Sequence, residues 1–231
     1  MSNEIKRIKK VYNTVYRHDP SDRNYIWNPS NPVSIFYRQA QERALIKLFN
    51  QINLDLSHLR LLDIGCGTGG FLRFMIDLGV HPENLAGLDL MSYRIREAKN
   101  ICPQGMDLRT GDGEKLPYKD QKFNFISQLT VFSSILDQEM KKKVAQEMMR
   151  ILSRHGYILW YDMRRGKSEN TLGLEMTEIK KLFPGLNVRA AWKLHAPLPY
   201  YLIKKSFLLS QISDRLMFFN KTHYLILLQK K

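Results

Sequence analysis

The sequence LLDIGCGTGG, at residues 61–70, decides which fold this chain of 231 residues adopts. The apolar residues that lead into it predict a short buried strand over residues 59–64, and the residues that follow predict a helix over 69–78. Glycines at this junction let the chain turn sharply and let a ligand approach the backbone closely. Gly65, Gly67 and Gly70 also match the GxGxxG pattern of dinucleotide-binding proteins, so this loop alone leaves the class of ligand open.

Strands and helices alternate along the rest of the chain. Apolar runs predict further strands over residues 84–90, 107–110, 123–129, 156–163, 187–194 and 222–228. Helical periodicity predicts helices over residues 33–52, 92–100, 137–152 and 175–182. This order is typical of an α/β protein with a parallel sheet and helices on both faces, which binds its ligand at the carboxyl ends of the strands.

Three carboxylates lie where those strand ends should meet. Asp63 lies in the first strand, two residues before the glycines, where an ammonium group of a ligand would gain a charge-assisted hydrogen bond and a pyrophosphate would gain nothing. Asp89 ends the second strand and can accept hydrogen bonds from both hydroxyls of an adenosine ribose. Asp112, within GDGEKLP at residues 111–117, can accept from an adenine amino group. The three side chains match an amino acid, a ribose and an adenine, with no phosphate to bind.

These motifs resemble those of the class I S-adenosylmethionine-dependent methyltransferases. LLDIGCGTGG, AGLDL, GDGEKLPY with KFNFISQ, and RILSRHGYILWYD follow the family's order and spacing over about residues 58–165 and are most similar to the small quinone and sugar methyltransferases. The resemblance implies a Rossmann-like, doubly wound, seven-stranded sheet that is mostly parallel with an antiparallel last strand. It also implies S-adenosyl-L-methionine as the cofactor and S-adenosyl-L-homocysteine as the product.

The resemblance also assigns residues to the parts of the cofactor. They are Asp63, Gly65, Gly67 and Gly69 for the methionine part, Asp89 for the ribose, Leu90, Asp112 and Gly113 for the adenine, and Gln128 beside both the methionine and the acceptor.

The chain is expected to divide at residue 57. Residues 1–57 would form an N-terminal helical cap or lid with the first helix, and this part closes over the cofactor in the family. Residues 58–231 would form the methyltransferase domain, with a helical insertion at about 196–220. That insertion has three interpretations: a helix that covers the sheet edge, a substrate lid, or an interfacial helix that contacts a lipid-linked acceptor.

The candidates for acceptor chemistry lie outside the cofactor motifs. Methyl transfer depends chiefly on alignment, but an oxygen acceptor must also lose a proton. His195, where the long connection begins, and Asp162, which ends the fifth strand, are the candidate catalytic residues. Arg164 and Arg165 could clamp a phosphate or carboxylate, and Tyr16 in the aromatic N-terminal stretch is a further candidate for binding the substrate. A structural role in the core, in an ion pair or on the surface competes with each assignment.

The net charge of +14 lies entirely in the two flanks. Residues 1–60 carry a net charge of +5, residues 61–163 carry zero, and residues 164–231 carry +9. The flanks form either a solvated basic surface or a surface for an anionic partner. Two cysteines, no secretion signal, no membrane-spanning run and no metal-ligand spacing predict a cytoplasmic protein without a protein-built metal site, and leave peripheral membrane contact open.

We therefore expect an S-adenosylmethionine-dependent methyltransferase that acts on a small, anionic acceptor. O-methylation of a sugar or of a lipid-linked intermediate is favoured, since the basic flanks, aromatic lid and apolar connection suit it together. The fourth strand ends in QLTV, without the Asn/Asp-Pro-Pro motif of enzymes that methylate base amines. Two alternatives stay open: an RNA methyltransferase, suggested by the net charge, and a non-catalytic cofactor-binding subunit.

Overall fold

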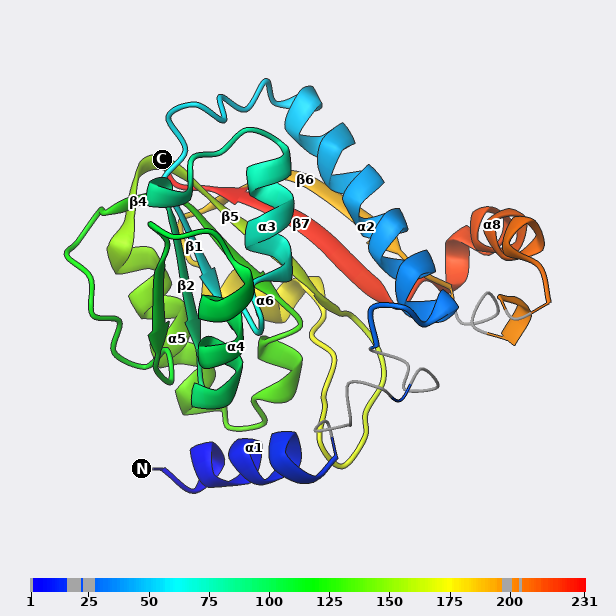
Figure 1. The fold of residues 1–231 in the computed structure, drawn as a ribbon, viewed down its shortest axis with the longest axis horizontal. Helices are drawn as coiled ribbons and strands as arrows, with labels where there is room; N and C mark the ends of the chain where they lie inside the picture. The colour runs from blue at the N-terminus through cyan, green and yellow to red at the C-terminus, as the bar shows by residue number, and fades with distance from the viewer. Residues whose placement is uncertain (1, 16–21, 23–27, 197–200, 204) are drawn as a thin grey trace.

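Seven strands form one mixed sheet at the centre of the molecule (Figure 1). The computed structural model describes residues 2–15, 22, 28–196, 201–203 and 205–231. The strands are β1 (Leu61–Ile64), β2 (Leu85–Asp89), β3 (Asp107–Thr110), β4 (Phe123–Leu129), β5 (Leu152–Met163), β6 (Asn187–Leu194) and β7 (His223–Gln229). Their order across the sheet is β3-β2-β1-β4-β5-β7-β6.

The strand directions confirm the predicted fold. Every neighbouring pair from β3 to β5 is parallel, whereas β7 runs antiparallel to both β5 and β6. The sheet is therefore Rossmann-like, mostly parallel, with an antiparallel last strand. Because parallel strands end together, the carboxyl ends of β1 to β6 share one edge with the start of β7.

Helices cover both faces of the sheet. They are α1 (Asn3–Thr14), α2 (Pro32–Gln51), α3 (Gly70–Asp77), α4 (Ser92–Ile101), α5 (Gln138–Ile151), α6 (Met176–Leu182) and α8 (Phe207–Leu216). Successive strand residues point to opposite faces and so divide between two cores. Leu62 and Trp160 pack in the core that includes α5 and α6, whereas Leu61 and Phe125 pack in the core that includes α2, α3 and α4.

α1 lies within the stretch that was expected to form an N-terminal helical cap or lid. Ser2 caps it by accepting a hydrogen bond from the backbone N of Ile5 at 3.2 Å. Ile5, Ile8 and Val11 bury their side chains. Their spacing of three residues is the helical signal at this end of the sequence. The division of the chain at residue 57 stays a prediction.

The long connection between β6 and β7 contains α8, which lies next to the N-terminal end of α2 and away from α3 to α6 (Figure 1). Phe207 at its start contacts Phe36 of α2, with ring centroids 5.5 Å apart. Within the described part of the chain, no helix combines the length and the hydropathy needed to cross a membrane.

Candidate active site

The glycine loop after β1 has a backbone that other residues cannot adopt freely. Gly65, Gly67 and Gly69 have φ angles of 73°, 55° and 80°. A Cβ atom added to Gly65 would lie 2.3 Å from Cγ2 of Val131. The amide nitrogen of Gly65 donates to the carbonyl of Leu88 at 2.7 Å, which ties the loop to the end of β2. The glycines therefore leave the loop backbone beside the strand ends without side chains, so a ligand can approach it closely.

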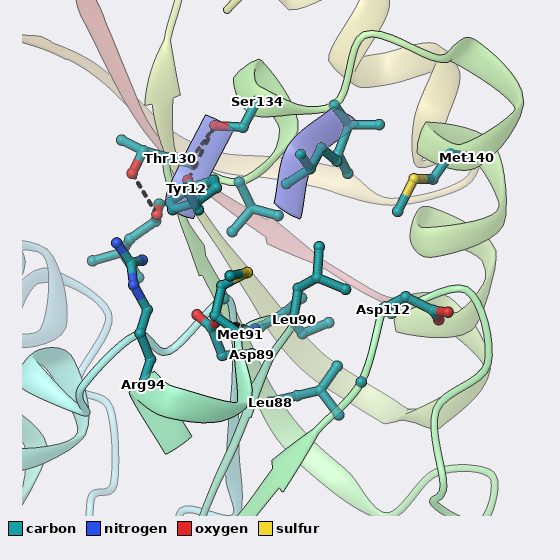
Figure 2. A pocket seen from close by; sticks show the side chains of 18 residues that line it. Tyr12, Leu88, Asp89, Leu90, Met91, Arg94, Asp112, Thr130, Ser134 and Met140 are labelled. Carbon is teal, nitrogen blue, oxygen red and sulfur yellow. Dashed lines mark hydrogen bonds between the residues drawn. The ribbon is translucent and has the colours of Figure 1, made fainter. Parts of the chain in front are cut away.

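A cleft of about 680 Å³ lies beside this loop (Figure 2). Its lining residues come from α1, the ends of β1 to β4 and the loops that follow them. They are Ile8, Tyr12, Ile64, Gly65, Leu88, Asp89, Leu90, Met91, Arg94, Gly111, Asp112, Gly113, Leu129, Thr130, Val131, Ser134, Ile135 and Met140.

Asp89 lies in the middle of the cleft and is 6% exposed. One carboxylate oxygen accepts from the backbone N of Gly67 at 2.9 Å, and the other accepts from the backbone N of Met91 at 2.8 Å. Each carboxylate oxygen has a second lone pair, so both can still accept from a ligand. Burial raises the pKa of Asp89, and the hydrogen bonds from Met91 and Gly67 and the charge of Arg94 oppose that rise. The position suits a bidentate contact with two vicinal hydroxyls.

Three other residues assigned to the adenine also line the cleft. Leu90 follows Asp89, and Asp112 lies on the opposite side of the cleft from Arg94 (Figure 2). One oxygen of Asp112 accepts from the backbone N of Glu114 at 3.1 Å, and the side chain is otherwise exposed. Gly113 has a φ of 78°, which turns the chain at this point. The structure therefore brings Asp89, Leu90, Asp112 and Gly113 to one cleft, and their contacts with a cofactor stay predictions.

Asp63 is buried beneath the glycine loop and does not line the cleft. It is 2% exposed, and one oxygen accepts from the hydroxyl of Ser127 at 2.7 Å. Burial, together with the nearby charge of Asp89, raises the pKa of Asp63 to about 7 although the Ser127 hydrogen bond lowers it. A carboxyl in this state would gain strongly from a cationic ligand group. Its contact with the methionine part of a cofactor stays a prediction.

Gln128 also lies behind the cleft wall, fully buried at the end of β4. Its side-chain oxygen accepts from the backbone N of Val131 at 3.0 Å, which holds the loop that faces Gly65. In the described part of the chain its side-chain nitrogen has no hydrogen-bond partner. A buried donor without a partner costs stability, so this atom is a candidate for contact with a ligand.

The helix α1 closes one side of the cleft, and the sequence analysis did not name its contacts. Tyr12 lies across the cleft from Asp89, and its hydroxyl is 3.4 Å from Oγ of Ser134 (Figure 2). Glu4 accepts from the backbone N of Leu136 at 2.5 Å, and Arg7 donates to the carbonyl of Ser134 at 2.6 Å. These contacts attach α1 to the loop between β4 and α5. The role of the N-terminal residues as a lid stays a prediction.

A second hollow of about 1000 Å³ lies between α2 and α3. Leu129 lines both this hollow and the cofactor cleft, so both reach the end of β4. Arg38 and Arg73 line the hollow together with Glu42 and with Asp77. Arg38 pairs with Glu42 at 3.8 Å, and Arg73 donates to the carbonyl of Thr68 at 2.7 Å. The guanidinium groups of Arg38 and Arg73 are candidates for contact with an anionic ligand in this hollow.

His195 ends the sixth strand at the same edge of the sheet, packed among aromatic rings. It is 1% exposed, and its ring centroid lies 4.7 Å from that of Tyr37 and 5.8 Å from that of Tyr161. Among the described residues neither ring nitrogen has a hydrogen-bond partner. Burial is the main cause that holds the pKa of His195 well below its ordinary value, with His223 and Lys221 adding to it. The imidazole is therefore neutral near pH 7 and can accept a proton.

The remaining predicted residues have structural contacts or lie outside the described residues. Asp162 is fully buried and accepts from the backbone N of Ser133 at 3.1 Å and of Met163 at 2.8 Å, and burial raises its pKa to about 6. Arg164 is 5% exposed, donates to the carbonyl of Lys221 at 3.1 Å and lies over the ring of Tyr224. These contacts favour structural roles for both, and their roles with the acceptor stay predictions. Arg165 is exposed, and Tyr16 lies outside the described residues.

The residues at the cleft fit S-adenosylmethionine. The loop leaves bare backbone where a Cβ would collide, and Asp89 has free lone pairs where a ribose would lie. Behind the loop lie the buried carboxyl of Asp63 and the side-chain nitrogen of Gln128, which has no hydrogen-bond partner among the described residues; both could face the methionine part. The cleft has hydrogen-bond donors and acceptors for an adenosine. Among the described residues, Arg94 is its only cationic lining residue, so the cleft lacks the positive charge that would favour a pyrophosphate.

Comparison with known proteins agrees with this fit. A family model described as a methyltransferase domain matches residues 62–160. Phthiotriol/phenolphthiotriol dimycocerosates methyltransferase 1 of Mycobacterium ulcerans (strain Agy99) is 29% identical over 147 residues, which cover 61% of this chain and 52% of that protein. The chain thus spans about half the length of the curated relatives it matches.

Solved structures show the same fold at low sequence identity. An S-adenosylmethionine-dependent methyltransferase from Mesorhizobium loti is 15% identical with a TM-score of 0.59, covering 80% of this chain and 96% of that one. The PH0226 protein from Pyrococcus horikoshii OT3 is 16% identical with a TM-score of 0.64, covering 96% and 99%. Residues 62–160 thus match a methyltransferase domain, and the chain has the fold of S-adenosylmethionine-dependent methyltransferases of known structure.

Proposed function

We propose that this methyltransferase methylates a hydroxyl oxygen of a small, anionic acceptor, such as a sugar or a lipid-linked intermediate. The observation that carries the proposal is the buried, neutral imidazole of His195 at the carboxyl edge of the sheet, whose ring nitrogens have no hydrogen-bond partner among the described residues. A hydroxyl acceptor must lose a proton during transfer, and a neutral imidazole is the usual group to accept it near pH 7. The acceptor in the name of the Mycobacterium ulcerans relative is a triol, which supports a hydroxyl as the methylated group.

The chain's own residues divide the work between the two spaces. Asp89 and Asp112 would orient the adenosine in the cleft, and the hollow between α2 and α3 would receive the acceptor. Arg38 and Arg73 would attract its anionic group. When bound, the cofactor supplies a methyl carbon whose bond to a sulfonium sulfur breaks as the acceptor oxygen bonds to it. A ring nitrogen of His195 would take the hydroxyl proton.

The test is transfer of a labelled methyl group from the cofactor into aqueous extract, lipid extract and RNA. We expect the label in a hydroxylated small or lipid-linked product, in an alkali-stable bond, since an ether survives mild alkali and a methyl ester does not. Label that ribonuclease releases would support the RNA alternative and overturn the proposal. Tight cofactor binding without labelling of any fraction would support the non-catalytic alternative.

A matched pair of variants tests the role of His195. His195 and His155 both have a φ of 59°, and asparagine tolerates that backbone region, so His195→Asn and His155→Asn place equal demands on the backbone. We expect His195→Asn to lower kcat by about 100-fold or more with unchanged cofactor affinity, because general-base contributions are of that size. His155→Asn, exposed at the opposite edge, should retain the parent's kcat. Equal activity in the two variants would exclude His195 as the base.

A further inference from the structure

The helix α8 presents its apolar side chains to solvent. Leu208, Leu209, Ile212 and Leu216 are 64%, 53%, 45% and 68% exposed, and their spacing places them on one side of the helix. Three further exposed rings flank the helix in the sequence: Tyr201 before it, and Phe218 and Phe219 after it. We call these seven residues the α8 face. Contiguous exposed apolar surface of this kind marks an interaction site more often than chance exposure.

The inward side of α8 is polar, which explains the orientation of the helix. Ser210 is fully buried and donates to the carbonyl of Ser206 at 2.9 Å. Asp214 accepts from the backbone N of Ala196 at 2.8 Å and pairs with Lys221 at 2.7 Å. A rotation that buried the leucines would break these contacts and leave charged groups unpaired. The polar contacts therefore hold the apolar side of α8 outward, where its four aliphatic side chains are exposed.

The charge around the α8 face is basic. Lys205 and Arg215 are exposed at its border. Asp214 is the only acidic residue of the sequence after Glu178, and its ion pair with Lys221 neutralises it. A second copy of the chain, docked face to face, would place these basic borders against each other. An apolar layer beneath an anionic surface complements both the leucines and the basic border.

We propose that the α8 face docks this protein onto an anionic lipid bilayer. The helix would lie in the plane of the interface, with its leucines at the acyl boundary and with Lys205 and Arg215 among the headgroups. The biological reason for docking rests on the proposed function, since a lipid-linked acceptor would be found at a membrane. Docking itself requires no methyl transfer.

Short contacts join α8 to the candidate active site. Phe207 contacts Phe36 of α2, the helix that also lines the acceptor hollow. Asp214 holds the backbone of Ala196, the residue next to His195. A bilayer under the α8 face would therefore lie beside the sheet edge that carries His195. A lipid-linked acceptor could reach that edge without leaving the membrane entirely.

The test is flotation of the full chain with vesicles of phosphatidylcholine alone, and of phosphatidylcholine with one third phosphatidylglycerol. We expect flotation with the anionic vesicles, weakened by salt. Leu208→Gln with Leu216→Gln should reduce the partition coefficient by about tenfold or more, because each substitution removes the free energy that a leucine side chain gains on transfer from water to an apolar environment. Lys205→Gln with Arg215→Gln should reduce partition to the anionic vesicles by about tenfold and leave binding to neutral vesicles unchanged. The matched control, Ile46→Gln with Ile101→Gln, removes apolar residues that are 41% and 49% exposed elsewhere and should float like the parent.

Two outcomes would overturn the proposal. One is equal flotation, or no flotation, of the parent and the Leu208→Gln/Leu216→Gln variant. The other is a parent that sediments as a dimer and becomes monomeric in that variant, which would assign the α8 face to a second copy. Thermal melting and cofactor affinity should match the parent in all three double variants, so that loss of flotation does not report misfolding. Transfer to a water-soluble acceptor is measured separately, so a failure of the proposed function is distinguishable from a failure of docking.

Discussion

Cofactor binding should depend on pH through Asp63. This carboxyl is 2% exposed, and burial, with the charge of Asp89 adding to it, raises its pKa to about 7 despite the hydrogen bond from Ser127. It is therefore mostly neutral at mildly acidic pH. Its predicted partner is the ammonium group of the cofactor, which favours the ionised carboxylate. Binding should consequently select the ionised form.

The magnitude follows from the ionised fraction. When only one form binds, the apparent Kd is the intrinsic Kd divided by the population of that form. With a pKa of about 7 for Asp63, the ionised fraction is about one half at pH 7 and about 3% at pH 5.5, so the affinity should fall about 15-fold across this window. The window ends near pH 7 because an α-amino group itself titrates at about 8.

Titration calorimetry of the parent and of Asp63→Asn measures this dependence. Asparagine can still accept from the Ser127 hydroxyl but cannot ionise, so the variant should bind with an affinity that is flat from pH 5.5 to 7. At pH 7 it should bind more weakly by about 1.5–3 kcal/mol, the usual worth of a hydrogen bond to a charged group. Asp112→Asn, at an exposed position of the same cleft, should weaken binding equally at every pH. An Asp63→Asn protein that retains the parent's slope would refute the reasoning.

The raised pKa of Asp63 also predicts that the cofactor-free protein becomes less stable as the pH rises, whereas cofactor binding becomes tighter. The pKa of Asp63 lies above its unfolded value of 3.8, so its contribution to stability is present at low pH and is lost as the pH rises through about 7. The loss reaches at most about 4 kcal/mol above pH 8, at ~1.4 kcal/mol per pKa unit. Asp63→Asn should therefore raise the Tm of the cofactor-free protein at pH 8 while it weakens cofactor binding.

Three other predictions concern the lid, the loop and the histidines. Glu4→Ala removes the acceptor that attaches α1 to Leu136, so the Kd for the cofactor should rise about tenfold or more, the effect of losing one charge-assisted hydrogen bond. Calorimetry checks this, and an unchanged Kd would exclude α1 as a lid. Gly65→Ala would place a Cβ 2.3 Å from Val131 at a φ of 73°. Cofactor binding, measured by the same titration, should therefore be lost or weakened by tenfold or more, which is about 1.4 kcal/mol. An affinity equal to the parent's would show that the loop relaxes freely. Burial lowers the pKa of His223 to about 4 from 6.5, so its stabilising contribution is complete above pH 6.5 and falls by about 2 kcal/mol between pH 7 and 5. In urea denaturation His223→Gln should show that much less loss over the same range, and an identical loss would count against the assignment.

The cofactor side of the site was predictable because its determinants are local. Residues 61–70 carry both the strand and the glycines, whose positive φ angles belong to that one stretch. Asp89 and Asp112 follow strands that the hydrophobic pattern predicts, and parallel strands that end together bring them to one cleft. No long-range packing information is needed for that step.

The acceptor side was less predictable because it depends on contacts between distant segments. Glu4 meets Leu136, 132 positions along the chain, and no periodicity reports such a contact. Arg164 looks like one of two surface arginines in the sequence, yet it is buried against Tyr224 and the carbonyl of Lys221. Asp162 looks like a residue that ends a strand at the active site, and its carboxylate accepts from Ser133, 29 positions earlier. Burial of a polar side chain follows from its tertiary partners, which composition does not show.

The net charge of the basic flanks does not by itself indicate which anionic partner they bind. Residues 164–231 have a net charge of +9, but Lys221 is paired with Asp214 and Arg164 is buried within the fold. Those two charges stabilise the connection between β5, β7 and α8 and cannot meet a polyanion. Lys205 and Arg215 remain exposed, and they border an apolar face that a polyanion such as RNA would leave uncovered. An anionic bilayer would satisfy both features at once, which is why the distribution of charge favours a lipid surface over RNA where the net charge alone does not.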